Sequence, residues 1–212
     1  MNSMAKPQVV HLNLSGSNRQ ESVPDFFNAI RSKADLKRIT KIPEATALFT
    51  STPRPPIFTD DGALCRPENH ELRAQAIEYI CSGGTIIGIS SFGSTFFEEL
   101  GLPWKAASYY REEFSLQSSF TAFKIDKLPF QYSMKAAHLV DVEKKHALYA
   151  PTPESEYEAL GLGKRVSEEP VDEEIVAAAF AKVGEGSFGY IGDVNYQEET
   201  VKVLLAMLGL LE

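Results

Sequence analysis

Apolar segments of two kinds alternate along the chain. Continuous apolar stretches, typical of buried strands, occur at 9–14 (VVHLNL) and 85–90 (TIIGIS). Apolar residues recur at helical spacing within 24–33, 67–82 and 197–211. Strands that alternate with helices are typical of the α/β class. We therefore expect a three-layer α/β fold, in which helices flank a mostly parallel sheet.

The segment between the first two helices is less regular. Residues 45–50 form a short apolar run, which predicts a second strand. The following residues, 51–68, contain too many prolines for a strand ladder. They predict a long surface loop.

The middle of the chain is rich in aromatic residues. Residues 101–135 carry eight of them without a sustained period. We interpret this region as an insertion that packs over the sheet. Residues 136–142 and 146–150 follow it and predict two strands joined by a charged turn.

The C-terminal part begins with an acidic segment. Residues 151–173 are punctuated by proline and glycine, which predicts a mobile loop. The segments 174–183 and 187–191 flank a Gly-Glu-Gly turn and predict a hairpin.

Composition limits the classes of function. The chain has 212 residues, 43 % of them apolar, which suits a single domain spanning 1–212. Its formal net charge of −8 argues against nucleic acid and anionic membranes as partners, since both require a basic surface. No apolar stretch reaches the roughly 18–20 residues of a membrane span.

The cysteines and the N-terminal residues bear on location. Cys65 lies in the predicted loop and Cys81 in a predicted helix, so we expect both thiols to be reduced. The opening residues, MNSMAKPQVVHLNL, lack the pattern of a signal peptide. Together these features predict a cytoplasmic protein. No Cys/His spacing indicates a zinc site, and we expect neither a metal nor a cofactor.

Candidate chemistry lies where the predicted strands end, because open α/β sheets bind ligands beyond the carboxyl ends of their strands. Turn-rich segments follow the strands at 15–18, 50–52, 90–93 and 192–195. The candidate ligand-binding residues in these segments are Ser17, Thr52, Gly93 and Asn195.

The most informative of these segments is Ser90-Ser91-Phe92-Gly93. A buried strand runs into this serine pair and then directly into a predicted helix at 94–100. That order is typical of a nucleophile elbow, in which a side chain sits on a tight turn above a helix N-terminus. The strict G-x-S-x-G pattern fails, because Ile89 stands where the first glycine belongs when Ser91 is the nucleophile. The alternative is that these serines only cap the helix.

Two segments resemble a known superfamily. NHELRAQAIEYICSGGTIIGISSFGSTFFEELG is similar to the central part of the ThuA-like group of class I glutamine amidotransferase-like proteins. AAFAKVGEGSFGYIGDVN is similar to the final strand pair of that superfamily. The resemblance covers about a quarter of the chain and implies a flavodoxin-like fold more firmly than an activity.

The departures from the superfamily decide which activity the resemblance implies. In its glutaminases the elbow residue is Cys, and His and Glu follow the late strand. Here the elbow offers Ser90 or Ser91, while Asp193 stands for the His and Asn195 for the Glu. A serine needs a base to become nucleophilic, and neither an ordinary Asp nor an Asn serves as His does. The resemblance therefore implies a member without thiolate glutaminase activity.

Another histidine could supply the base. His11 lies in the middle of a predicted strand, as a buried core histidine would, whereas His70 and His146 are expected at the surface. His138 lies in the apolar strand AAHLVDV and could face a cleft. We therefore take His138, together with Ser90, Ser91 and Asp193, as the candidate catalytic residues.

Two further features allow a functional and a structural interpretation. Arg111 follows an aromatic segment and could hold a carboxylate or phosphate, or it could pair with Glu112 or Glu113. Asp60 and Asp61 precede Gly62 and could form an acid/base pair, although adjacent aspartates before glycine more simply make a turn.

Three functions remain open. The first is a non-glutaminase protein that binds a small polar molecule at the carboxyl edge of the sheet. The second is a serine-dependent hydrolase or sugar-modifying enzyme that uses Ser90 or Ser91, with Asp193 or His138 accepting the proton. The third is an interaction domain or homodimer built on the aromatic-rich insertion.

Overall fold

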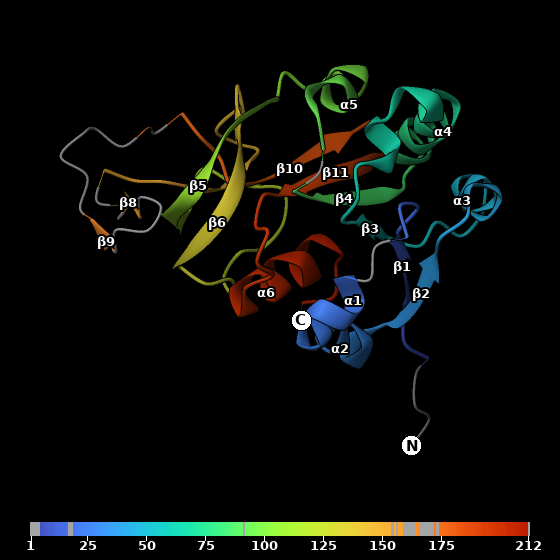
Figure 1. Ribbon diagram of the computed structural model, residues 1–212, viewed down its shortest axis with the longest axis horizontal. Helices are drawn as coiled ribbons and strands as arrows, with labels where there is room; N and C mark the ends of the chain where they lie inside the picture. The colour runs from blue at the N-terminus through green and yellow to red at the C-terminus, as the bar shows by residue number, and fades with distance from the viewer. Residues whose placement is uncertain are drawn as a thin grey trace.

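The computed structural model describes residues 5–16, 19–90, 92–153, 155, 157–158, 164–165, 172 and 174–211. Within this part of the chain, one large mixed sheet runs through the molecule and helices cover both of its faces (Figure 1). The expected three-layer α/β fold is confirmed.

Five parallel strands form one half of the sheet. Their order is β2-β1-β3-β4-β11, and every neighbouring pair is parallel. The strands are β1 (Gln8–Leu12), β2 (Asp35–Ile39), β3 (Ile57–Thr59), β4 (Thr85–Ile89) and β11 (Gly186–Ile191). Their carboxyl ends therefore meet at a single edge of the sheet.

Antiparallel strands extend the sheet beyond β11. The order continues β10-β7-β5-β8-β9, and β6 pairs with β5. These strands are β10 (Ala178–Val183), β7 (Ala147–Ala150), β5 (Lys105–Leu116), β6 (Gln131–Val140), β8 (Tyr157–Glu158) and β9 (Lys164–Arg165). β10 and β11 form the predicted hairpin. Its turn requires glycine, because Gly184 has φ +57° and a Cβ there would lie 2.6 Å from the Cys81 carbonyl oxygen.

The helices fall into two groups, one on each face (Figure 1). Their apolar sides enter two separate cores, one containing Phe27 of α2 and Leu204 of α6, the other containing Leu48 of α3 and Phe97 of α5. The helices are α1 (Arg19–Ser22), α2 (Pro24–Lys33) and α6 (Glu198–Met207) on the first face, and α3 (Ile42–Phe49), α4 (His70–Cys81) and α5 (Ser94–Glu99) on the second. Two 3₁₀ turns, η1 (Ala63–Cys65) and η2 (Pro67–Asn69), precede α4. No helix among the described residues has the length and apolar character needed to cross a bilayer.

The prediction of a strand at 45–50 is wrong. This segment belongs to α3, which has a proline in its first turn and buries Ala45, Leu48 and Phe49 along one side. That spacing of three and four residues is helical. The strand lies earlier, at β2, which the sequence did not reveal because its first four residues are exposed or half-buried.

Two regions in which no strand was predicted contain strands. The proline-rich segment 51–68 includes β3, a three-residue strand that is fully buried between β1 and β4. The aromatic-rich segment 101–135 includes β5 and the start of β6, which together form a long ribbon. The first five residues of β5 are exposed, so no alternation of buried and exposed positions marks them as a strand. Most of the predicted loop at 151–173 lies outside the described residues.

Candidate functional site

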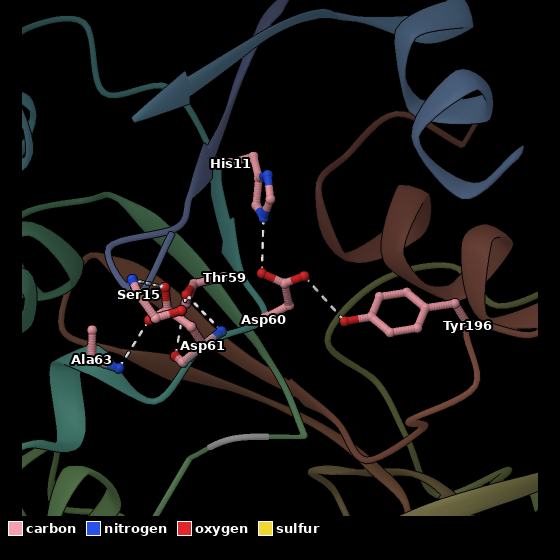
Figure 2. Close-up of polar contacts among 7 residues, drawn as sticks. All are labelled: His11, Ser15, Thr59, Asp60, Asp61, Ala63 and Tyr196. Atoms are coloured by element: carbon pink, nitrogen blue, oxygen red, sulfur yellow. Dashed lines mark hydrogen bonds and ion pairs between the residues drawn. The ribbon is translucent and has the colours of Figure 1, made fainter. Parts of the chain in front are cut away.

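A buried carboxylate lies at the carboxyl edge of the parallel strands. Asp60 follows β3 directly and is 2 % exposed. Its Oδ1 lies 2.9 Å from Nε2 of His11, and its Oδ2 accepts a hydrogen bond of 3.2 Å from the Tyr196 hydroxyl. Figure 2 shows Asp60 in the middle of these three side chains. Residues separated by 49 and 136 positions along the chain thus converge on one carboxylate.

The protein core fixes the position of His11. The imidazole of this β1 residue is fully buried and stacks on Phe58, with ring centroids 4.7 Å apart and planes 8° apart. Phe27 lies on another side, at 5.0 Å. These two aromatic rings fix the position of the imidazole. Because Asp60 lies at its Nε2, the histidine in turn fixes the position of the Asp60 carboxylate. The expectation of a buried, hydrogen-bonded core histidine is confirmed.

Asp61 has a different role from its neighbour. Its Oδ2 accepts the Ser15 backbone N–H at 3.0 Å, and its Oδ1 accepts the Ala63 backbone N–H at 2.9 Å (Figure 2). Asp61 therefore ties the loop after β1 to the start of η1. Of the adjacent aspartates, Asp61 makes the turn, and Asp60 faces the histidine and the tyrosine.

The predicted elbow follows β4, two strands away from β1. Ser90 has a left-handed backbone with φ +56°, which is rare for residues other than glycine and typical of strained elbows. Its N–H donates to the Ile191 carbonyl at 2.8 Å, which joins the elbow to the end of β11. Gly88 lies against Phe92, whose ring would be 2.4 Å from a Cβ at that position. Ser91 lies outside the described residues.

A thiol lies beside the turn after the elbow. The Gly93 backbone N–H donates to Sγ of Cys65 at 3.4 Å. Burial raises the pKa of the Cys65 thiol, so this sulfur is an unreactive acceptor at neutral pH. Both Cys65 and Cys81 are free thiols, as expected. The Gly93 N–H thus serves to hold η1 against the start of α5.

Asp193 is committed to the turn before α6. Its Oδ1 accepts the Asn195 N–H at 2.9 Å, and its Oδ2 accepts the Gln197 N–H at 2.8 Å and the Thr200 hydroxyl at 2.7 Å. The carboxylate is fully buried, while Asn195 is exposed. Three donors within seven residues satisfy the buried carboxylate of Asp193 in the turn that leads into α6. This geometry gives it a structural role and leaves the proposed role as a proton acceptor without support.

His138 lies in the ribbon and contacts residues of β5. Its Nδ1 is 3.0 Å from the Ser108 hydroxyl, and its ring contacts Tyr110 and Phe114. Burial lowers the pKa of His138 to about 4, so the imidazole is neutral at pH 7. The serine that the structure places beside this histidine is therefore Ser108.

The remaining sequence-predicted residues are dispersed. Thr52 is exposed and borders a shallow cleft of about 380 Å³ together with Lys37 and Glu44. Arg111 donates to the Ser133 hydroxyl at 3.4 Å within the ribbon. Ser17 lies outside the described residues. The described residues contain no group of three or more His, Cys, Asp or Glu that could hold a metal ion.

Tyr196 is the site residue that the sequence did not reveal. It follows β11, has φ +57°, and packs edge-on against Phe26 at 4.8 Å. No local pattern marks it, because its partner lies 136 residues away. The left-handed backbone turns the chain between the Asp193 turn and α6, and the hydroxyl reaches Asp60.

The fold is similar to that of proteins of known structure. The similar structures include a ThuA-like protein and a GMP synthase subunit, and the likeness lies in the α/β fold. A GMP synthase subunit from Thermoplasma acidophilum is similar at TM-score 0.58 and 12 % identity, over 97 % of this chain and 94 % of that one. A ThuA-like protein from Parabacteroides merdae is similar at TM-score 0.54 and 10 % identity, over 91 % and 84 %.

A part of some larger enzymes has the same fold. A β-galactosidase from Bacillus circulans sp. alkalophilus is similar at TM-score 0.59 and 10 % identity, over 96 % of this chain. The chain spans about 31 % of the length of that enzyme. No family model and no curated protein matches the sequence. At these identities the likeness concerns the fold alone.

Proposed function

We propose that this protein is a non-glutaminase with a glutamine amidotransferase-like fold, which binds a small polar molecule at the carboxyl edge of its sheet. The observation that carries the proposal is Asp60, a carboxylate oriented by His11 and Tyr196 at the end of a central strand. Ligands of open α/β sheets bind at this edge. A carboxylate held by two distant side chains is also typical of a built site.

The absence of glutaminase chemistry is supported by the elbow and by Asp193. Ser90 occupies the elbow, where the glutaminases that the sequence resembles have a thiol. The carboxylate of Asp193 is saturated by its own turn. Among the described residues, no hydrogen bond of a histidine reaches Ser90.

The chemistry of the edge favours a ligand rich in hydrogen-bond donors. A carboxylate accepts hydrogen bonds and repels anions. Sugars and polyols present several hydroxyl donors, and we propose them as the ligand class. Asp60 is buried and bonded to His11 and Tyr196, so it would orient the edge from behind the ligand, and the left-handed turn at Ser90 would supply a hydroxyl to the ligand.

A binding screen tests this proposal. Glucose, galactose, ribose, glycerol and myo-inositol are titrated into the protein, and heat release and melting temperature are recorded. We expect at least one sugar or polyol to bind, and the Asp60→Asn variant to bind it at least tenfold more weakly. The exposed Asp126→Asn variant is the matched control and should bind normally. Equal binding by the Asp60→Asn variant would exclude Asp60 as the anchor.

The strained backbone of Ser90 favours serine-dependent hydrolysis as a second candidate function. A residue held at φ +56° directly after a buried strand is presented as a nucleophile would be. The test is turnover of p-nitrophenyl acetate by the wild type and by the Ser90→Ala and Ser91→Ala variants. Turnover that Ser90→Ala abolishes would establish the hydrolase, and equal turnover by all three proteins would rule it out.

A further inference from the structure

A second polar cluster lies in the β5–β6 ribbon, apart from the carboxyl edge. Glu112 on β5 and His138 on β6 are 2 % and 1 % exposed. Each has one buried atom without a hydrogen-bond partner among the described residues, Oε2 in Glu112 and Nε2 in His138. Buried polar atoms are normally paired, so two unpaired atoms in one cluster indicate a missing partner.

The other polar atoms of the cluster are joined in a chain of hydrogen bonds. Tyr110 is hydrogen-bonded to both Glu112 and Ser108, and the Ser108 hydroxyl lies 3.0 Å from Nδ1 of His138. When Glu112 is ionised, Tyr110 must donate to it, because a carboxylate only accepts. Ser108 then donates to Tyr110, and Nδ1–H of His138 donates to Ser108. Both unpartnered atoms are acceptors in this arrangement.

Rings and negative charge surround the two acceptors. The His138 ring lies 4.5 Å from the Tyr110 ring and 5.4 Å from the Phe114 ring. The Asp172 carboxylate acts on Glu112, Tyr110 and His138, and the described charges that act on these three groups are all acidic. Burial, with the charge of Asp172, raises the pKa of Glu112 to about 7. Within the described part of the chain, ionised Glu112 therefore lacks a compensating cation.

We propose that this cluster binds a small organic cation, such as a protonated amine. Its N–H groups would donate to Oε2 of Glu112 and Nε2 of His138, and its charge would lie against the ring of Tyr110. An anion would meet two acceptors and two carboxylates. A neutral hydroxyl compound would satisfy the acceptors without compensating the charge of Glu112. A metal ion fits poorly, since the described residues offer no group of three ligands.

The cluster can be reached from the surface. Ser108 and Asp172 are exposed, and Tyr110 is partly exposed. A ligand could approach along these residues, and it must displace the groups that bury Glu112 and His138 to reach their unpaired atoms. This site would be independent of Asp60 and of the function proposed for the carboxyl edge.

The experiment titrates organic cations into the full chain at constant ionic strength. Ethylammonium, putrescine, agmatine and choline are the probes, and ethanol and sodium chloride are the comparison solutes. We expect at least one cation to bind and to raise the melting temperature. Its Kd should fall as the pH rises from 6 to 8, because Glu112 releases its proton over this range while the probes stay charged. Among the described residues, the titratable groups that act on Glu112 are Tyr110 and Asp172, and His138 lies beside Tyr110.

Matched variants decide whether Glu112 is the anchor. The Glu112→Gln variant should raise the Kd at least tenfold, whereas Glu113→Gln, on the opposite face of β5, should leave it unchanged. If Glu112→Gln does not fold, the His138→Gln variant takes its place, with an expected increase in Kd of about threefold. The Asp60→Asn variant should bind the cation normally, which separates this proposal from the one above.

Three results would overturn the proposal. The first is the absence of binding by every cation in the panel at millimolar concentration. The second is equal binding by wild type and Glu112→Gln. The third is a crystal structure in which an ordered water joins Oε2 of Glu112 to Nε2 of His138 and stays in place at saturating cation.

Discussion

The two polar clusters differ in how their buried carboxylates are satisfied. At the carboxyl edge, Asp60 has a histidine at one oxygen and a tyrosine at the other. In the ribbon, Glu112 has Tyr110 at one oxygen and no described partner at the other, and the nearby charge of Asp172 has the same sign. Both carboxylates are almost fully buried. Burial alone therefore does not determine whether a carboxylate stabilises the fold.

The difference bears on the free energy of unfolding. Removing a buried charge that has good partners lowers stability, because its partners are left unpaired. A buried charge without a partner itself lowers stability until a ligand supplies that partner. We therefore expect opposite responses to neutralisation. Removing the charge of Asp60 should lower the free energy of unfolding, whereas removing the charge of Glu112 should raise it.

The largest expected effect is that of Asp60→Ala. The substitution leaves His11 and Tyr196 without their carboxylate in the core, and we expect a loss of about 3–5 kcal/mol in the free energy of unfolding. Urea denaturation measures this loss, and the exposed Asp126→Ala variant is the control. A loss below about 1 kcal/mol would mean that the three side chains do not act as a unit.

The second effect concerns the pH dependence of stability. The folded pKa of Glu112 is raised from 4.5 to about 7, so its stabilising contribution is complete below pH 4.5 and is lost as the pH rises towards 7. The folded pKa of His138 is lowered from 6.5 to about 4, so its contribution is complete above pH 6.5 and is lost as the pH falls towards 4. The two contributions oppose each other between pH 4.5 and 6.5.

Single variants separate these contributions. Relative to the wild type, Glu112→Gln should gain stability as the pH rises through this window, and His138→Gln should lose it. Each change should be on the order of 1–3 kcal/mol, because solvent at the exposed side of the cluster screens part of the effect. Urea unfolding at pH 4.5, 5.5, 6.5 and 7.5 measures both. Parallel pH profiles for wild type and Glu112→Gln would contradict the raised pKa.

The third effect returns to the carboxyl edge. Asp193→Ala removes the acceptor of three hydrogen bonds at the start of α6, and leaves the buried Thr200 hydroxyl with fewer partners. We expect a loss of about 2 kcal/mol in unfolding free energy. Asn195→Ala is the control, because this exposed residue should change the unfolding free energy by less than about 0.5 kcal/mol. If both variants behave alike, the hydrogen bonds of Asp193 do not stabilise this turn.

The sequence revealed the elements whose signals are local. Helix α2 was predicted with its observed bounds, because Pro24 opens it and Phe26, Phe27 and Ile30 lie on one side. Helix α3 was mistaken for a strand, because a helix of eight residues with three buried positions resembles a short apolar run. Strand β3 was missed, because three residues are too few to show a period.

The candidate site shows the same contrast between local signals and contacts of distant residues. The turn at Ser90 could be predicted, since the strand, the serines and the helix are consecutive in the sequence. The convergence of His11, Asp60 and Tyr196 could not, because it depends on the order of β1, β3 and β11 in the sheet. Asp193 was chosen for its position after the last strand, and only the structure shows its carboxylate bound within its own turn.

The smallest expected effect concerns the elbow itself. The φ of +56° at Ser90 is unfavourable for a residue with a Cβ, and glycine adopts it readily. If the serine has no interaction that stabilises the fold, Ser90→Gly should raise the unfolding free energy by about 0.5–1 kcal/mol. Urea denaturation measures the change, with Ser90→Ala as the control that keeps the Cβ strain. A gain in unfolding free energy would mean that the serine lowers the stability of the fold, as expected for a residue kept for a binding or catalytic role. A loss would instead assign the Ser90 side chain to the structure of the turn.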